Sequence, residues 1–202
     1  MVPDREVVVV PMPVELRPRV SSPGQAPRCL FVGGYSGHNL DGLQWFLSEV
    51  WPGVLAAQPD AEFDVVGTVG KAVPAGAPRV RVHGPLSDLD SVYASACVCL
   101  VPLRFGTGLK IKLTEAMAHG RAVVSTSAGA EGFPELEGGE VAPVAESAPA
   151  MVAAIVRLLR DRGLREIQIA RQDSWLRSRF ASDVAVRPLV DFLAASAIPA
   201  FV

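Results

Sequence analysis

Gly106-Thr107-Gly108-Leu109-Lys110-Ile111-Lys112-Leu113-Thr114-Glu115-Ala116-Met117-Ala118-His119-Gly120 is a glycine-rich turn that runs into a charged helix near the middle of the chain. The apolar runs on either side of it, Val98–Leu103 and Ala122–Thr126, are expected to be buried strands. Free backbone N–H groups and the positive end of the helix dipole point at whatever such a turn faces. The stretch therefore predicts an anion site, and most simply a site for phosphate.

The predicted helix has two distinct faces when its residues are spaced at about 100°. Lys112, Glu115 and His119 share one flank, at spacings that make side chains adjacent. The expected core stripe consists of Leu109, Leu113, Ala116, Met117 and Gly120. The lysine can contact a diphosphate, and the carboxylate can accept two hydrogen bonds from a diol such as ribose. An isolated Lys–Glu pair is more often a solvated surface pair, so it is the glycine turn that favours a ligand.

The rest of the chain mostly alternates between short apolar runs and helical patterns. We expect strands at 29–32, 63–66, 80–83, 98–103 and 122–126, and an edge strand at 140–144 because it contains proline. We expect helices at 39–57, 86–95, 109–118, 147–160, 164–180 and 184–195, the fourth of them capped by Ser147. This order predicts an α/β fold with a doubly wound parallel, Rossmann-like sheet followed by C-terminal helices. Ligands bind at the carboxyl ends of the strands in such sheets.

Composition narrows the classes of function. Half of the 202 residues are hydrophobic, and the formal net charge of -2 gives no reason to expect a nucleic-acid partner. No apolar run approaches the ~20 residues of a transmembrane helix, and the first residues do not resemble a secretory signal. The three histidines show no metal-ligand spacing, so no metal is expected. Cys29, Cys97 and Cys99 are expected to be buried small residues in a reducing compartment.

The segment Pro102–Thr126 closely resembles the donor-binding signature of the retaining glycosyltransferases of group 1 (GT4-type), which have the GT-B fold. Other segments agree with that family in order and spacing: Phe31–Gly34 with His38-Asn39 and Trp45-Phe46, Phe63–Gly67, and Val82–Leu86 with Asp88, Tyr93 and Ala94. The resemblance covers residues from about Cys29 to Phe180. It implies that the chain is the C-terminal, donor-binding half of such an enzyme.

The resemblance also implies a division of the chain. Residues 1–27, punctuated by Pro11, Pro13, Pro18, Pro23 and Pro27, would be an interdomain linker. Residues 28–180 would be the Rossmann-like nucleotide-sugar-binding domain, and residues 181–202 a C-terminal helical extension. The donor substrate would be a nucleoside diphosphate sugar, bound without a metal or other cofactor.

The site residues that the resemblance implies all belong to donor binding, and it identifies no certain catalytic residue in this half. They are Gly33, Gly34, His83, Arg104, Gly106, Thr107, Gly108, Leu109, Lys112 and Glu115. Glu115 would bind the ribose, and the backbone of His83–Leu86 would border the base. Lys112 would carry most of the contact with the phosphates and Arg104 less. Lys110 would carry least, because its side chain is expected to face solvent.

The sequence departs from the family at two places. Most members have an acidic residue at the position of Thr107, where it contacts the donor sugar. Members also often carry an arginine and a lysine after the first strand, where this chain has Gly34 and His38. The resemblance therefore does not imply a carboxylate at the sugar.

A full enzyme of this kind also has an acceptor half, which the resemblance does not place in this sequence. We expect hexosyl transfer to need that half, as a domain in cis or as a separate acceptor subunit, and this chain alone to be inactive. The expected location is cytoplasmic, with peripheral membrane attachment through the acceptor half. Two alternatives remain open: a non-catalytic nucleotide-binding module or subunit of the same fold, and a nucleotide-sugar epimerase.

Overall fold

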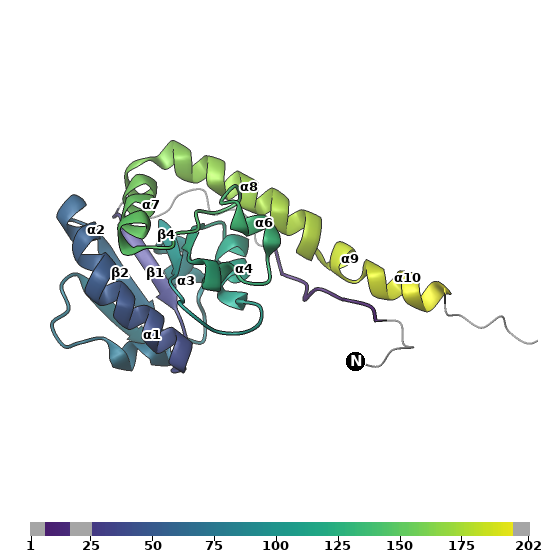
Figure 1. The fold of residues 1–202 in the computed structure, drawn as a ribbon, viewed down its shortest axis with the longest axis horizontal. Coiled ribbons are helices and arrows are strands. Elements are labelled where there is room, and N and C mark those ends of the chain that lie inside the picture. Colours follow the sequence, from purple (N-terminus) through teal and green to yellow (C-terminus); the bar gives the residue numbers. More distant parts are fainter. Residues whose placement is uncertain (1–6, 17–25, 196–202) are drawn as a thin grey trace, which may run out of the picture.

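The computed structural model describes residues 7–16 and 26–195, and these contain a five-stranded parallel sheet in the order β3-β2-β1-β4-β5 (Figure 1). The strands are β1 (Arg28–Val32), β2 (Glu62–Val66), β3 (Val80–Gly84), β4 (Val98–Val101) and β5 (Ala122–Ser125). Helices lie on both faces of the sheet, so the prediction of a doubly wound α/β fold is confirmed.

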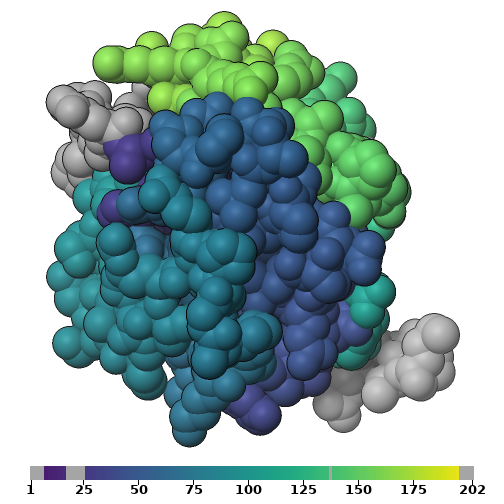
Figure 2. Space-filling model, turned by 90° about the vertical axis from the view of Figure 1, so that its left-hand side faces the viewer, coloured from purple at the N-terminus to yellow at the C-terminus, as the bar shows by residue number. Residues whose placement is uncertain are grey.

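The first helical stretch is continuous from α1 (Gly37–Trp45) through a π-helical turn, η1 (Phe46–Val50), into α2 (Trp51–Ala57). The other elements are η2 (Thr68–Ala72), α3 (Asp90–Ser95), α4 (Ile111–Ala118), α5 (Ser127–Ala130), α6 (Pro134–Glu137), α7 (Ala148–Arg160), α8 (Arg162–Phe180), α9 (Ser182–Ala185) and α10 (Arg187–Ala195). Figure 2 shows the α1–α2 stretch in dark blue beside the green of α7 and α8, in agreement with the packing of α2 on α7.

The core is built on both faces of the central strands. Every residue of β4 and β5 is buried, as expected for parallel strands that are covered by helices on both sides. Phe46 and Trp51 from the first helical stretch pack on Phe63 of β2, with ring centroids 4.8 and 5.4 Å away. This aromatic contact fixes the first helices against β2.

Two glycines allow the loops at the carboxyl ends of the strands to approach one another closely. A Cβ at Gly42 of α1 would lie 2.6 Å from the carbonyl oxygen of Pro102, just after β4. A Cβ at Gly67 would lie 2.2 Å from the carbonyl oxygen of Gly33, and Gly67 also has a φ of +98°. These contacts bring the loops that follow β1, β2 and β4 together at one edge of the sheet.

Several predicted boundaries were wrong, and three of the differences concern helices near the loops or the end of the chain. The helix predicted at 86–95 begins at Asp90, where the Asp88 carboxylate accepts a hydrogen bond from the Asp90 N–H at 3.0 Å and forms a turn in front of the helix. The signature helix begins at Ile111, since Gly108 has a left-handed φ of +77° and Lys110 a non-helical ψ of 87°. The last predicted helix is interrupted at Val186, between α9 and α10.

The predicted edge strand at 140–144 does not form, because only Val144 makes an isolated bridge, to Ser125. Pro143 has no N–H to donate to a strand ladder, which limits pairing there. By contrast, the Ser147 cap is present, and its hydroxyl accepts from the Ala150 N–H at 3.4 Å. Cys29, Cys97 and Cys99 are buried and free, as predicted, and burial raises the pKa of the Cys29 and Cys99 thiols.

The two ends of the described chain differ in how they contact the domain. Residues 7–16 have no regular secondary structure, but Val14 donates its N–H to the Phe180 carbonyl and packs against the core with Leu16. None of α10 is buried, and Figure 1 shows it extending away from the sheet. The parts of the predicted linker at 1–6 and 17–25, and of the predicted extension at 196–202, lie outside the described residues. The domain boundaries stay predictions.

Candidate functional site

The candidate site lies where β1 and β4 end side by side. The strand order runs outward from this pair in both directions, so it is the topological switch point at which doubly wound sheets bind ligands. The turn at Gly33 and Gly34 follows β1, and the loop from Pro102 to Lys110 follows β4 and leads into α4. Both glycine-rich segments singled out from the sequence therefore meet at one edge of the sheet.

Lys112 in the first turn of α4 points into this edge. Its Nζ donates to the Asn39 Oδ1 at 2.5 Å and lies 4.5 Å from the centroid of the Phe31 ring. A Cβ at Gly33 would be 3.4 Å from the same nitrogen, so the glycine leaves the ammonium room. Burial lowers the pKa of Lys112 from 10.5 to about 8. The side chain is thus a largely desolvated cation, which a bound anion would stabilise.

The N-terminus of α4 adds backbone donors to this cation. Among the described residues, the N-cap residue Lys110 makes no side-chain capping hydrogen bond, so N–H groups of the first turn lack the usual capping acceptor. Gly106 and Gly108 both have left-handed φ values, of +134° and +77°, which lets the loop turn sharply in front of the helix. Thr107 is exposed between them. The arrangement matches an anion-binding helix terminus.

Glu115 lies one turn further along α4 and is held from a neighbouring helix. Its Oε2 accepts a hydrogen bond from the Tyr93 hydroxyl at 3.1 Å, and the Tyr93 ring stacks on His119 with centroids 4.1 Å apart. Burial raises the pKa of Tyr93, which keeps the hydroxyl protonated as a donor. A cavity of about 200 Å³ beside Glu115 is also lined by Ile111 and by Met12–Glu15. One carboxylate oxygen is thus committed to Tyr93, and the group borders a space.

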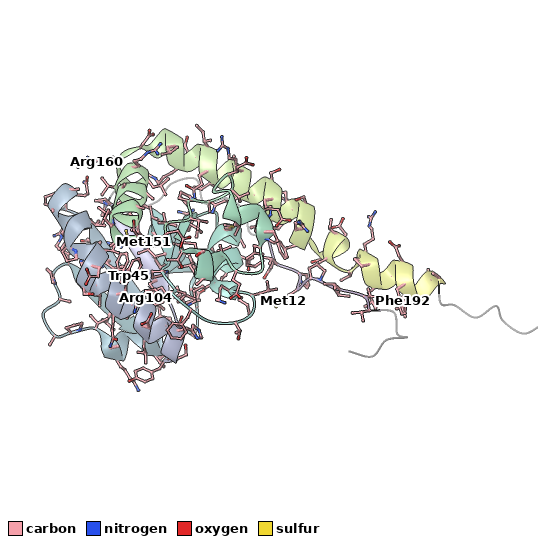
Figure 3. All side chains as sticks on the ribbon, in the orientation of Figure 1. Met12, Trp45, Arg104, Met151, Arg160 and Phe192 are labelled. Carbon is pink, nitrogen blue, oxygen red and sulfur yellow. The ribbon has the colours of Figure 1, made fainter. Side chains whose placement is uncertain are left out.

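Arg104 lies apart from this arrangement. Its guanidinium makes a two-pronged ion pair with the Asp41 carboxylate of α1, with Nε at 2.8 Å from Oδ2. This hydrogen bond lowers the pKa of Asp41. Arg104 lines a separate cavity of about 310 Å³ with Trp45 and Ser147, and Figure 3 shows it on the α1 side of the molecule. Its charge is therefore already neutralised locally.

The prediction for Lys110 was wrong, because its side chain is buried rather than turned to solvent. The exposed fraction is 6%, and Nζ donates to the Gly108 carbonyl at 2.6 Å and lies 3.4 Å from the Glu131 carboxylate. Leu109 was also misplaced, since it precedes the helix, is half-exposed and packs over Gly132 instead of joining the core stripe. Both differences follow from the later start of α4.

The side chain of His83 turns into the sheet. Its Nε2 lies 3.0 Å from Oδ1 of Asp64, a buried carboxylate of β2 that also lies 3.4 Å from the Arg28 guanidinium. The backbone of His83–Leu86 lies at the carboxyl end of β3, and its contact with a base stays a prediction.

Sequence reasoning did not assign His38 or Asn39 to the site. The His38 ring lies against Gly106, 3.6 Å from the place of a Cβ there, and its Nε2 is 3.2 Å from the Ser36 hydroxyl. Burial, aided by Lys112 and Lys110, lowers the pKa of His38 and holds it neutral. Asn39 is buried on α1, and its side chain reaches Lys112. This contact joins residues far apart in the sequence, so local spacing could not have predicted it.

Among residues 7–16 and 26–195, no three His, Cys, Asp or Glu side chains are grouped so that they could hold a metal ion. In the same residues, no helix has the length and apolar character needed to cross a membrane.

Comparison with known proteins gives a consistent result. The family model of the group 1 glycosyl transferases matches residues 26–161 of the chain. A protein of Klebsiella pneumoniae, described as an uncharacterized 44.6 kDa protein in the cps region, is 30% identical over 115 residues. That match covers 51% of this chain and 30% of the Klebsiella protein.

Several solved structures share the fold. A mutant of S. aureus TarM in complex with fondaparinux, alpha-GlcNAc-glycerol and UDP matches 90% of this chain and 38% of its own, with a TM-score of 0.72 and 12% identity. Anabaena HepE in complex with UDP-glucose matches 85% of this chain and 49% of its own, with a TM-score of 0.64 and 17% identity. The C-terminal domain of LpcC, a group 1 family protein from Francisella tularensis, matches 79% of this chain and 88% of its own, with a TM-score of 0.62 and 19% identity. The chain thus spans less than half the length of TarM and HepE.

Proposed function

The chain belongs to the group 1 glycosyl transferases, and on that premise we propose that it is the donor-binding half of a retaining glycosyltransferase. In this proposal it binds a nucleoside diphosphate sugar, and an acceptor half, in cis or as a separate subunit, completes the active site. The observation that carries the proposal is the meeting of Lys112, the uncapped N-terminus of α4 and the Gly33 turn at the switch point of the sheet.

The proposed reaction breaks the bond between the anomeric carbon of the sugar and a diphosphate oxygen. A hydroxyl oxygen of the acceptor forms the new bond on the same face of the sugar, and its proton is lost. Negative charge develops on the departing diphosphate, where the Lys112 ammonium and the backbone N–H groups of α4 would stabilise it. Closure of the acceptor half over this edge would exclude water during transfer.

Other residues would place the rest of the donor. The free lone pairs of the Glu115 carboxylate would accept from the ribose hydroxyls, since only one hydrogen bond, from Tyr93, occupies it among the described residues. The backbone of His83–Leu86 would border the base. We assign the neutralisation of the diphosphate to Lys112 and the helix terminus, so we propose that transfer does not require a metal ion.

The complexes of HepE with UDP-glucose and of TarM with UDP make UDP the first ligand to test. We would measure the melting temperature of the chain with UDP, GDP, ADP and TDP and with the matching monophosphates, each at millimolar concentration with EDTA. Stabilisation by a bound ligand grows as RT ln(1 + [L]/Kd), so at least one diphosphate should raise the melting temperature more than its monophosphate. The Lys112→Ala variant is the matched control and should lose that difference. A chain that no diphosphate stabilises would refute the proposal.

Thr107 favours one second candidate, a nucleotide-binding module that does not transfer sugar. Thr107 is exposed on the loop before α4, at the position where most members of the resembled family carry a carboxylate that contacts the sugar. The two candidates differ in whether the sugar contributes to binding. If UDP-glucose, UDP-galactose and UDP-N-acetylglucosamine all bind no better than UDP, the module is favoured; a clear preference among the sugars favours the transferase.

A further inference from the structure

Asn39 is a buried amide that touches the phosphate end of the proposed site without being able to carry charge. Only 5% of the residue is exposed, although asparagine is mostly found at protein surfaces. Its Nδ2 donates to the Gly34 carbonyl at 3.0 Å, and its Oδ1 accepts from the Lys112 Nζ at 2.5 Å. Both ends of the amide are therefore used, one on the turn after β1 and the other on α4.

These two hydrogen bonds fix which way the amide faces. An asparagine side chain has an acceptor oxygen and a donor NH2 group at opposite ends. The Gly34 carbonyl can only accept, and the ammonium of Lys112 can only donate, so the network leaves a single orientation. Gly33 completes the fit, because a Cβ there would lie 3.2 Å from the Asn39 amide and 3.4 Å from the Lys112 Nζ.

The partner of a cation decides how much of its charge remains for a ligand. A carboxylate would cancel the charge of Lys112 and would also repel a diphosphate. An apolar residue would leave the desolvated ammonium without an acceptor and favour the neutral amine. An amide oxygen accepts one N–H of the ammonium and leaves the net charge of the pair positive. Within the described residues, the remaining N–H groups of the ammonium make no other hydrogen bond.

We propose that Asn39 is the positioning residue for Lys112: its amide holds the ammonium protonated and aimed at the turn after β1, where the donor diphosphate binds. This inference rests on the proposed donor site. The charged or titratable groups that face the ammonium are Glu115 on its own helix, Lys110 at the start of that helix, and His38 on α1, which is held neutral. From β1, the neutral ring of Phe31 packs against it. Asn39 is thus the hydrogen-bonding partner that comes from outside α4.

The composition of the chain makes the protonation state of Lys112 directly measurable. Lys71, Lys110 and Lys112 are its only lysines, so protein labelled with carbon-13 at the lysine ε position gives three signals. Replacing each lysine in turn by arginine assigns them. Lys71 is exposed and lies on η2, away from α4, so its signal is the internal control for the substitutions at Asn39. The titration needs no ligand, so it tests the Asn39–Lys112 contact whether or not the donor has been identified.

The expected result is a Lys112 midpoint of about 8 in the wild type, below the ordinary lysine value of 10.5. Asn39→Ala should lower this midpoint by about one pH unit or more, because a hydrogen bond to a charged group is lost. Asn39→Asp, which has the same shape, should raise it, because a carboxylate stabilises the ammonium. Ser36→Ala is the matched control on the same turn: it removes a contact of neutral His38 and should leave the Lys112 midpoint unchanged.

Binding of UDP by the same variants, measured by calorimetry at pH 7.5, gives the second arm. Asn39→Ala should weaken UDP about threefold or more by loss of the ammonium, as expected at this pH for a midpoint one unit lower. Asn39→Asp should weaken UDP about tenfold by repulsion, and both variants should leave uridine unchanged. If the Lys112 midpoint is the same in the wild type, Asn39→Ala and Asn39→Asp, the inference is overturned even if UDP binds. Midpoints that shift as expected in a chain that binds no diphosphate refute the donor site instead, and with it the role of Asn39 toward a ligand. Should Asn39→Ala not fold, Asn39→Asp alone still decides, since only its upward shift agrees with the inference.

Discussion

Binding of a nucleoside diphosphate should weaken as the pH rises through about 8, and Lys112→Arg should remove that dependence. In the free protein, burial lowers the pKa of Lys112 to about 8. A bound diphosphate stabilises the ammonium and raises that pKa, so the complex holds more protons than the free protein above this pH. By linkage, the affinity is highest well below pH 8 and decreases as the pH rises above 8.

The size of the effect follows from the position of the pKa. If only the protonated form of Lys112 binds, the apparent Kd increases by the factor 1 + 10^(pH − pKa), which is about 1.1 at pH 7 and about 11 at pH 9 for a pKa near 8. We therefore expect about a tenfold loss of affinity for UDP between these pH values. Isothermal titration calorimetry of the whole chain at constant ionic strength measures it, and buffers of different ionisation enthalpy count the protons taken up.

Lys112→Arg isolates the cause, because a guanidinium stays protonated throughout this range. Any titration of UDP itself or of His38 appears equally in both proteins, so the difference between the two profiles belongs to Lys112. Uridine is the ligand control, and its affinity should be independent of pH in both proteins. Identical profiles for the wild type and Lys112→Arg would show that Lys112 does not titrate at the site and would refute the reasoning.

Four further outcomes are expected. Lys112→Ala should weaken UDP by about 10- to 150-fold, the equivalent of one charge-assisted hydrogen bond, and change uridine little by calorimetry. Glu115→Gln should weaken the binding of UDP more than that of 2′-deoxy-UDP. If the substitution and the loss of the 2′-hydroxyl weaken binding additively across these four affinities, Glu115 does not contact the 2′-hydroxyl. Tyr93→Phe should reduce UDP affinity severalfold with little change in melting temperature, because the Tyr93 hydroxyl acts on Glu115. If the affinity for inorganic pyrophosphate, which has no ribose, falls by the same factor as that for uridine, a ribose role is contradicted. Gly67→Ala should cost more than about 3 kcal/mol in urea denaturation because its Cβ would meet a carbonyl, whereas Gly76→Ala, also at positive φ but in open space, should cost about 1 kcal/mol.

The elements of this fold that local patterns define were predicted from the sequence. Short segments rich in valine and other apolar residues gave the five sheet strands, and their alternation with helical periods gave the parallel order. The Ser147 cap was predictable because its hydroxyl bonds to a backbone group three residues away. The run 140–144 looked similar, but whether a short segment completes a ladder depends on a neighbouring strand as well as on its own residues.

The helix after the glycine turn shows where periodicity stops being sufficient. The period was right, so Leu113, Ala116 and Met117 are buried as predicted. The start was not, because a left-handed Gly108 delays the helix until Ile111 and frees Leu109 from the stripe. A shift of two residues at a helix end changes which side chains turn inward just before it, and this is why Lys110 is buried.

The three cations expected at the phosphates differ in the side chains that they contact. Rules of local spacing cannot predict these contacts, because the partners are distant in the sequence. Arg104 pairs with Asp41 from 63 residues away, and Lys110 reaches Glu131 from 21 residues away, so a ligand would have to displace a carboxylate from either. Lys112 reaches Asn39 from 73 residues away, and that partner is neutral. Because an amide leaves the charge of the pair uncancelled, Lys112 is the cation of the three from which a diphosphate gains most and displaces least. The sequence placed all three lysine and arginine charges near one strand end; only the folded partners decide which of them is available.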